Sequence, residues 1–128
     1  MPTIDLRGKR VATLLPENWT LGQQVVWTDD LYRKGRAPKI GEQSGFLTIV
    51  RGLPSTGVRF QNVSTFTLQE GQITAQGIWD SGMSHITLAI TGGTDRYDRI
   101  RGEIDVKLYP GHNPPTTYTA KFRITYRG

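Results

Sequence analysis

The stretch AITGGTDRYDRIRG, residues 89–102, decides the fold class, because its glycine pair followed by charged residues fits two quite different structures. A phosphate-binding loop joins a strand to a helix whose N-terminus faces the anion. The preceding residues ITLAI suit a strand, but the following residues IRGEIDVKLY alternate with period two and predict another strand. We therefore expect Gly92 and Gly93 to turn the chain between two antiparallel strands, where glycine tolerates a positive φ.

The same alternation of apolar and polar residues recurs along the chain and predicts strands rather than helices. It is clearest in TYTAKFRITYR (117–127), VRFQNVSTFTL (58–68) and QITAQGIW (72–79). Successive side chains of a strand point to opposite faces, so each segment has one face available for a core. The residues on these faces are Tyr118, Ala120, Phe122, Ile124 and Tyr126, then Phe60, Asn62, Ser64 and Phe66, and finally Ile73, Ala75, Gly77 and Trp79.

Seven or eight such strands fit within the 128 residues, and the sequence contains no internal repeat or low-complexity linker. A chain of this length builds one core, so we expect a single domain over residues 1–128. We expect an all-β fold, either a sandwich or a closed barrel, and a barrel of about eight strands leaves no open edge and can hold one small ligand. The longest irregular segment is expected at residues 34–43, and Asp29 and Asp30 are expected to cap a turn.

The composition bears on several other kinds of site. The chain has no cysteine and only two histidines, His85 and His112, and it carries no metal-binding or cofactor-binding motif, so we expect no metal and no cofactor. The net charge is +5, but the basic residues form no dense stripe with interleaved aromatic residues, so we expect no nucleic-acid partner. No apolar run has the length of a signal peptide core or a membrane span, which predicts a cytoplasmic protein without a membrane partner.

Extended to LAITGGTDRYDRIRGEIDVKL (88–108), the opening stretch resembles the signature of plant allene oxide cyclases and of dirigent proteins. In both, an apolar strand runs into a glycine-rich turn, and an aromatic residue and a further glycine precede the next strand. Two other segments resemble allene oxide cyclase in the same order, namely LGQQVVWTDDLY (21–32) and FQNVSTFTLQEGQITAQG (60–77). The resemblance thus covers residues 21–108.

This resemblance implies that the all-β fold is a single eight-stranded antiparallel β-barrel around an apolar cavity, assembled into a homo-oligomer that is a dimer or a trimer. Plant allene oxide cyclases use a glutamate in the first strand and a cysteine in the cavity, whereas this chain offers Asp5 and no cysteine. These departures argue against allene oxide cyclisation itself. Compact bacterial members of the group include cyclases of polyketide or related intermediates, some of which use Diels–Alder chemistry, and the chain is more similar to those.

Aromatic residues on strand faces that carry little charge are the candidate walls of a ligand cavity. We expect Trp27, Phe60, Phe66, Trp79 and Phe122 to bind the substrate, although aromatic residues more often fill a core. Polar residues on the same faces are the candidate catalytic groups, and these are Tyr126, Asn62 and Tyr118. An amide in that place can instead bridge strands or bind water, and a tyrosine hydroxyl can instead reach solvent at the barrel mouth.

These features lead us to expect a cofactor-independent cyclase or isomerase that folds a hydrophobic polyketide, polyene or epoxide intermediate into one reactive conformer. The alternative is a non-catalytic, dirigent-like or lipocalin-like barrel that binds a small hydrophobic molecule. A third hypothesis is an interaction domain whose barrel is filled. The volume of the cavity separates the third hypothesis from the others, and turnover of a bound polyene separates the first from the second.

Overall fold

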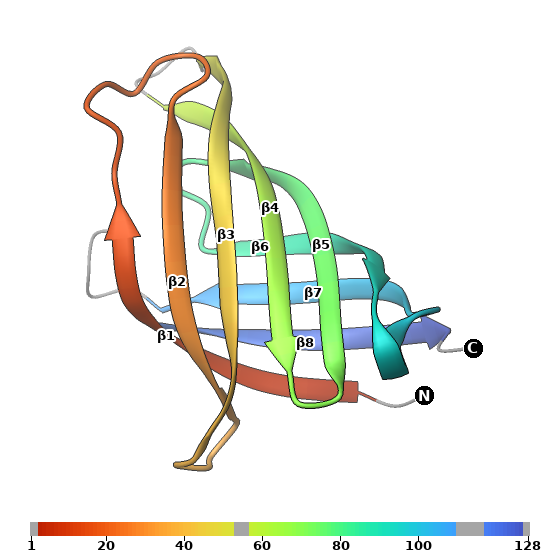
Figure 1. Cartoon of the computed structure of the whole chain (residues 1–128). Coiled ribbons are helices and arrows are strands. Elements are labelled where there is room, and N and C mark those ends of the chain that lie inside the picture. The colour runs from red at the N-terminus through yellow and green to blue at the C-terminus, as the bar shows by residue number, and fades with distance from the viewer. Residues whose placement is uncertain (1–2, 53–56, 110–116, 127–128) are drawn as a thin grey trace.

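The computed structural model describes residues 3–52, 57–109 and 117–126, which form eight strands and one short 3₁₀ helix (Figure 1). The strands are β1 (Thr3–Leu14), β2 (Gln24–Arg33), β3 (Lys39–Gly52), β4 (Val58–Leu68), β5 (Gly71–Asp80), β6 (His85–Gly93), β7 (Arg101–Leu108) and β8 (Thr117–Tyr126). The helix η1 (Asp95–Tyr97) lies between β6 and β7. No helix among the described residues is long and apolar enough to cross a membrane.

The eight strands form a closed barrel in which every strand pairs antiparallel with the next and β8 pairs with β1. The expected all-β fold with a single eight-stranded antiparallel barrel is therefore confirmed. Figure 1 shows β2, β3 and β4 nearly upright, while β6, β7 and β8 lie across them on the far side. This strong twist follows from the right-handed twist of the individual strands, which a closed sheet accumulates around its circumference.

The alternating residues point into the barrel as expected, but they form two clusters of different character. The larger cluster fills one end of the barrel, where Phe66 and Phe122 are fully buried and pack edge to face with their ring centroids 5.0 Å apart. The smaller cluster consists of Val25, Trp27, Leu47, Ile49 and Phe60, with Val58 and Trp79 packed against it. Only the end of the barrel that contains the larger cluster is therefore a filled core.

The stretch at residues 89–102 joins two antiparallel strands, but its glycine pair differs from the expectation. Gly92 and Gly93 belong to β6 and are not among the residues with a positive φ. Gly93 is required for another reason, because a Cβ there would collide with the backbone oxygens of Tyr97 and Gln72. The positive φ angles of this region occur at Asp95 (55°) and Gly102 (141°), on either side of the turn that η1 makes.

Two other local expectations are wrong. The segment 34–43 is not one long loop, because β3 already begins at Lys39 and the β2–β3 connection spans only residues 34–38. Asp29 and Asp30 do not cap a turn but lie within β2, where Asp29 is fully buried and Asp30 forms an ion pair with Lys39. The long strands β2 and β3 extend the barrel wall around Asp29.

Candidate functional site

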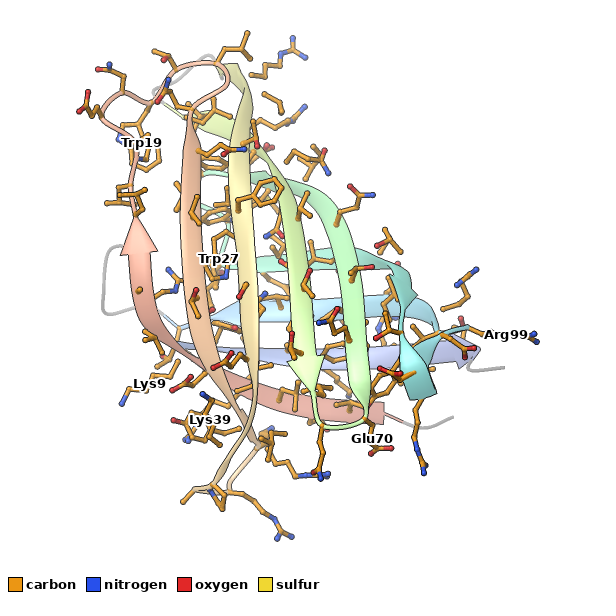
Figure 2. The ribbon with its side chains drawn as sticks, in the orientation of Figure 1. Lys9, Trp19, Trp27, Lys39, Glu70 and Arg99 are labelled. Atoms are coloured by element: carbon orange, nitrogen blue, oxygen red, sulfur yellow. The ribbon has the colours of Figure 1, made fainter. Side chains whose placement is uncertain are left out.

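A cavity of about 470 Å³ occupies the end of the barrel that the core leaves open. Figure 2 shows Trp19 on the β1–β2 connection at the upper end and Trp27 lower on β2, whereas Lys39 and Glu70 lie at the opposite end. The apolar residues of the cavity wall are Val25, Trp27, Leu47, Phe60, Trp79, Ile86, Leu88, Val106 and Leu108. The residues of its mouth are Leu15, Trp19, Ser81, Gly82, Met83, Ser84 and Tyr109. The volume suits one small organic molecule.

Three aromatic rings form a continuous surface on one side of this cavity. The rings of Phe60 and Trp79 stack with their centroids 5.3 Å apart and their planes 24° apart. Trp19 meets Phe60 edge to face at 6.3 Å. The indole nitrogen of Trp79 donates a hydrogen bond to the backbone oxygen of Met83 (3.0 Å), which holds its ring in place. Flat or conjugated molecules can therefore stack along this wall.

The inner end of the cavity is polar. Its groups, here called the inner polar cluster, are Arg10, Asp29, Gln43, Asn62, Ser64 and Tyr118, which come from β1, β2, β3, β4 and β8. Asp29 lies behind the cavity surface, with no exposed area, and the other five residues line the cavity. Among the described residues, no fully buried side-chain nitrogen or oxygen lacks a hydrogen-bond partner.

Asp29 and Tyr118 are the centre of this cluster. Arg10 Nε donates to Asp29 Oδ1, and the Arg10 guanidinium also lies over the Trp27 ring, 5.6 Å from its centroid. Tyr118 Oη lies 2.8 Å from Asp29 Oδ2 and 2.6 Å from Gln43 Oε1. Trp27 Nε1 donates to the same Gln43 oxygen at 3.0 Å. Side chains from four strands thus form one connected hydrogen-bond network.

Asn62 adds a hydrogen-bond donor to the inner end. Ser64 Oγ donates to Asn62 Oδ1 at 2.6 Å, which directs the amide nitrogen away from Ser64. Within the described part of the chain, that nitrogen has no protein acceptor. Every fully buried side-chain nitrogen or oxygen there has a hydrogen-bond partner, so this nitrogen is not fully buried. The Asn62 amide nitrogen therefore faces the cavity, where it can donate to a ligand oxygen.

Burial sets the ionisation of the two central groups. Loss of water contact raises the pKa of Asp29, against the opposing effect of the Arg10 charge. Burial also raises the pKa of Tyr118 well above its ordinary value. The Tyr118 hydroxyl therefore keeps its proton at neutral pH.

A glycine makes room for Tyr118. Gly8 on β1 pairs directly with Tyr118 on β8 and is buried. A Cβ at Gly8 would overlap the aromatic ring and hydroxyl of Tyr118. Gly8 therefore allows the ring to lie flat against β1, with its hydroxyl beside Asp29.

The structure brings together most of the residues that the sequence singled out. Trp27, Phe60, Trp79, Asn62 and Tyr118 all line the cavity. The substrate or catalytic roles assigned to them stay predictions.

Three of the expected site residues lie elsewhere or outside the description. Phe66 and Phe122 belong to the filled core rather than to the cavity wall, because alternation along a strand cannot tell which end of a barrel is filled. Tyr126 ends β8, but its side chain lies outside the described residues, as does His112. His85 begins β6 with an exposed side chain, as a solvated histidine would.

Sequence reasoning missed Arg10, Asp29 and Gln43. Each has the same strand phase as buried neighbours, since Asp29 alternates with Trp27 and Leu31. That phase is the available signal, but the adjacent carboxylates Asp29 and Asp30 predict a turn from local sequence, and this prediction hides the strand.

Comparison with known proteins places the chain in a family. The family profile described as "Allene oxide cyclase barrel like domain" matches residues 3–124. No curated protein sequence matches the chain significantly.

Among the described residues, no cluster of histidine, aspartate or glutamate side chains could hold a metal ion.

Several solved structures share the fold. One, "Pyocyanin demethylase", has a TM-score of 0.82 at 23% identity and covers 97% of this chain and 100% of its own. AbnU, described as an exo-specific intermolecular Diels-Alderase, has a TM-score of 0.75 at 18% identity over 94% of both chains. The pterocarpan synthase dirigent protein PsPTS1 has a TM-score of 0.71 at 15% identity and covers 96% of this chain and 92% of its own. At these identities the similarity to solved structures establishes the barrel alone. The family match over residues 3–124 shows that the chain belongs to the allene oxide cyclase barrel-like family.

Proposed function

We propose that this protein binds one elongated, hydrophobic, conjugated molecule that carries an oxygen acceptor at one end, and catalyses its cyclisation or isomerisation. The observation that carries the proposal is the polarity of the cavity along its length. Stacked aromatic rings line its outer part, and hydrogen-bond donors from Asn62 and Tyr118 lie at its inner end. Such a site orients a ligand in one direction, with its carbonyl inward.

The mechanism follows from this orientation. A flexible polyene that is held in one folded conformer avoids much of the entropy cost of reaching a cyclic transition state, which is worth up to roughly 7–11 kcal/mol in well-oriented reactions. A hydrogen bond from Tyr118 or Asn62 to the carbonyl oxygen withdraws electrons from the conjugated system and stabilises charge that develops on oxygen. The hydroxyl of Tyr118 suits this role because its pKa is raised, so it stays a donor at neutral pH.

The AbnU structure, named as a Diels-Alderase, and a structure described as a heme-binding cyclase that catalyses [4 + 2] cycloaddition give support by analogy of fold. The apolar cavity by itself supports a second candidate, which is a barrel that binds its ligand without converting it. Hydrogen-bond donors at the inner end of the cavity agree with either role, so turnover has to decide.

The test uses a panel of linear polyenones that carry both a diene and a conjugated carbonyl. Quenching of the Trp27 and Trp79 fluorescence measures binding, and chromatography with mass spectrometry detects a product of unchanged mass and shorter conjugation. We expect binding and conversion, with conversion reduced on the order of 10²-fold in Tyr118→Phe through the lost donor. The matched control is Tyr32→Phe, which alters a half-buried tyrosine of β2 outside the cavity.

The possible results discriminate among the hypotheses. Binding without conversion by any member of the panel would favour the non-catalytic barrel. Absence of binding by all of them, and by pyocyanin as a flat aromatic probe, would contradict the ligand cavity itself. Equal conversion by wild type and Tyr118→Phe would remove the hydroxyl from the mechanism.

A further inference from the structure

The inner polar cluster contains two short oxygen–oxygen separations that meet at one hydroxyl. Tyr118 Oη lies 2.8 Å from Asp29 Oδ2 and 2.6 Å from Gln43 Oε1, and both distances are those of O–H···O hydrogen bonds. A tyrosine hydroxyl has a single hydrogen, so it can donate to only one of these oxygens. The other separation needs a second hydrogen, because two unprotonated oxygens at that distance repel each other.

Gln43 cannot supply that hydrogen. The indole N–H of Trp27 is a donor only, and it lies 3.0 Å from Gln43 Oε1. If the amide group were turned around, its own N–H groups would face the Trp27 N–H. The Gln43 oxygen therefore accepts from both Trp27 and Tyr118, which means that Tyr118 donates to Gln43.

Asp29 is the remaining source of the second hydrogen. Its Oδ1 accepts from Arg10 on β1, and its Oδ2 faces Tyr118 on β8. Two charged residues lie close to Asp29, namely Arg10 and the adjacent Asp30 on β2. The Arg10 charge lowers the pKa of Asp29, and the Asp30 charge raises it. The carboxyl group has no exposed area, which disfavours the ionised form.

We infer that Asp29 is a neutral acid in the resting protein, and that Asp29 and Tyr118 form a proton relay that ends in the cavity. Tyr118 is the catalytic residue of this pair, because it lines the cavity, and Asp29 is a positioning residue that acts through Tyr118. The relay deepens the proposed function and rests on it for the substrate, whereas the protonation of Asp29 can be tested without any ligand.

The relay transfers protons in two coupled steps. When a ligand is bound, its carbonyl or enolate oxygen replaces Gln43 as the acceptor of the single Tyr118 hydrogen. The Tyr118 O–H bond breaks as this proton passes to the ligand oxygen, and a new O–H bond forms there. The electron pair left on Tyr118 Oη takes the proton of Asp29 Oδ2, which leaves a carboxylate beside the Arg10 guanidinium. When the product oxygen releases its proton, the same path returns it to Tyr118 and Asp29.

The first experiment needs no ligand. Protein labelled with ¹³C at the aspartate carboxyl carbons is titrated by NMR from about pH 4 to pH 8, and Asp29→Asn identifies the Asp29 resonance by its disappearance. We expect the Asp29 carbon to keep its neutral position to a clearly higher pH than that of Asp80, whose pKa is lowered by its hydrogen bonds from Arg59. An Asp29 carbon that is already ionised at the start of the titration would overturn the inference, whether or not the cavity binds anything.

The second experiment tests whether the Tyr118 proton reaches the cavity. Prodan, an apolar naphthalene ketone, shifts its emission to longer wavelength when its carbonyl accepts a hydrogen bond. We expect bound Prodan to emit at shorter wavelength in Tyr118→Phe than in wild type. The emission should be unchanged in Asp29→Asn, because an asparagine amide can donate to Tyr118 and accept from Arg10 as the neutral acid does. Asp30→Asn, an outward-facing neighbour, is the matched control.

The outcomes separate this inference from the proposed function. Identical emission in wild type and Tyr118→Phe would contradict donation into the cavity, whereas failure of Prodan to bind would contradict the ligand cavity and leave the NMR result to decide the state of Asp29. With a converted polyenone, Asp29→Asn should lower kcat at least on the order of 10²-fold with an unchanged KM. An unchanged kcat would show that Asp29 supplies no proton.

Discussion

Asp29 lies where a carboxyl group can reach no water, and its environment determines how it can be used. Burial raises its pKa, although the Arg10 charge acts in the opposite direction. An acid with a raised pKa beside a cavity is a common feature of functional sites. The half-buried Asp80 shows the contrast, since hydrogen bonds from Arg59 lower its pKa.

The raised pKa predicts how the contribution of Asp29 to stability varies with pH. Its ordinary value is 3.8, and the folded value is higher, so as pH rises the unfolded chain ionises first. The contribution of Asp29 is therefore greatest below the unfolded pKa and declines as pH rises through the folded pKa. Urea unfolding of wild type and Asp29→Asn should show wild type losing stability relative to the variant as pH rises.

The matched control for this measurement is Asp80→Asn, which should give the opposite slope. Because the folded pKa of Asp80 is lowered, Asp80 stabilises the fold at pH values above its unfolded pKa. This contribution to stability is lost as pH falls through the folded pKa. If wild type and Asp29→Asn kept a constant difference in unfolding free energy across this range, Asp29 would have no raised pKa.

Gly8 is the second single residue on which the site depends. In Gly8→Ala the added methyl group would overlap the ring of Tyr118, so the ring has to move away from Asp29. We expect a loss of stability of about 1–3 kcal/mol, as for other overpacked interiors, together with weaker ligand binding. Gly52→Ala is the control, because a Cβ at Gly52 meets no other atom. Equal stability of both variants would show that Tyr118 is not held against Gly8.

At the scale of the elements, one strand serves both halves of the barrel. On the inward face of β4, Phe60 and Asn62 line the cavity, whereas Phe66, further along the same face, belongs to the filled core. The change occurs where Ser64 bonds to Asn62. A strand of constant alternation can thus carry both a ligand wall and a core.

This division predicts two different effects for truncating an aromatic residue. Phe122→Ala removes a fully buried ring that packs against Phe66, and it should destabilise the protein by about 3–5 kcal/mol. Trp79→Ala removes a half-buried ring of the cavity wall, so it should cost clearly less stability and should weaken the binding of Prodan. Thermal melts with and without Prodan measure both effects. Similar losses of stability in both variants would mean that Trp79 fills a core.

At the scale of the whole molecule, the outer surface of the barrel carries an apolar row across four strands. Leu14 pairs with Val26, Val26 with Phe46 and Phe46 with Val63. Leu14, Val26 and Phe46 have relative exposures of 69%, 42% and 38%, and the row contains no charge. We propose that a second copy of the chain covers this row, because a row of exposed apolar side chains without charge marks an interaction site and can pack against its own copy.

Light scattering at micromolar concentration should therefore give a mass above 14.3 kDa, that of a dimer or trimer. Phe46→Glu, which places a charge in the middle of the row, should shift the mass to that of the single chain. Thr125→Glu, at an exposed position on β8, should leave the assembly intact. A wild-type protein of 14.3 kDa at all concentrations tested would contradict the proposal.

The prediction of the fold succeeded because its signal is local. Alternation with period two identifies a strand and the residues that share one of its faces from a few neighbouring residues. The faces given for the segments of β4, β5 and β8 are the ones that carry their buried residues. The strand after residues 89–102 was predicted in the same way, although the turn itself uses Asp95 and Gly102 instead of the glycine pair.

The sequence by itself determined the strands and the residues that share each strand face, because alternation and turn residues act over a few positions. Its resemblance to allene oxide cyclases favoured a closed barrel over a sandwich. Only the tertiary structure decided which end of the barrel is filled and which is hollow, since that depends on the side chains that meet across all eight strands. It also brought Arg10, Asp29, Gln43 and Tyr118 together from four strands. No local pattern encodes that meeting, because the distances between these groups follow from the strand register and from the closure of β8 against β1.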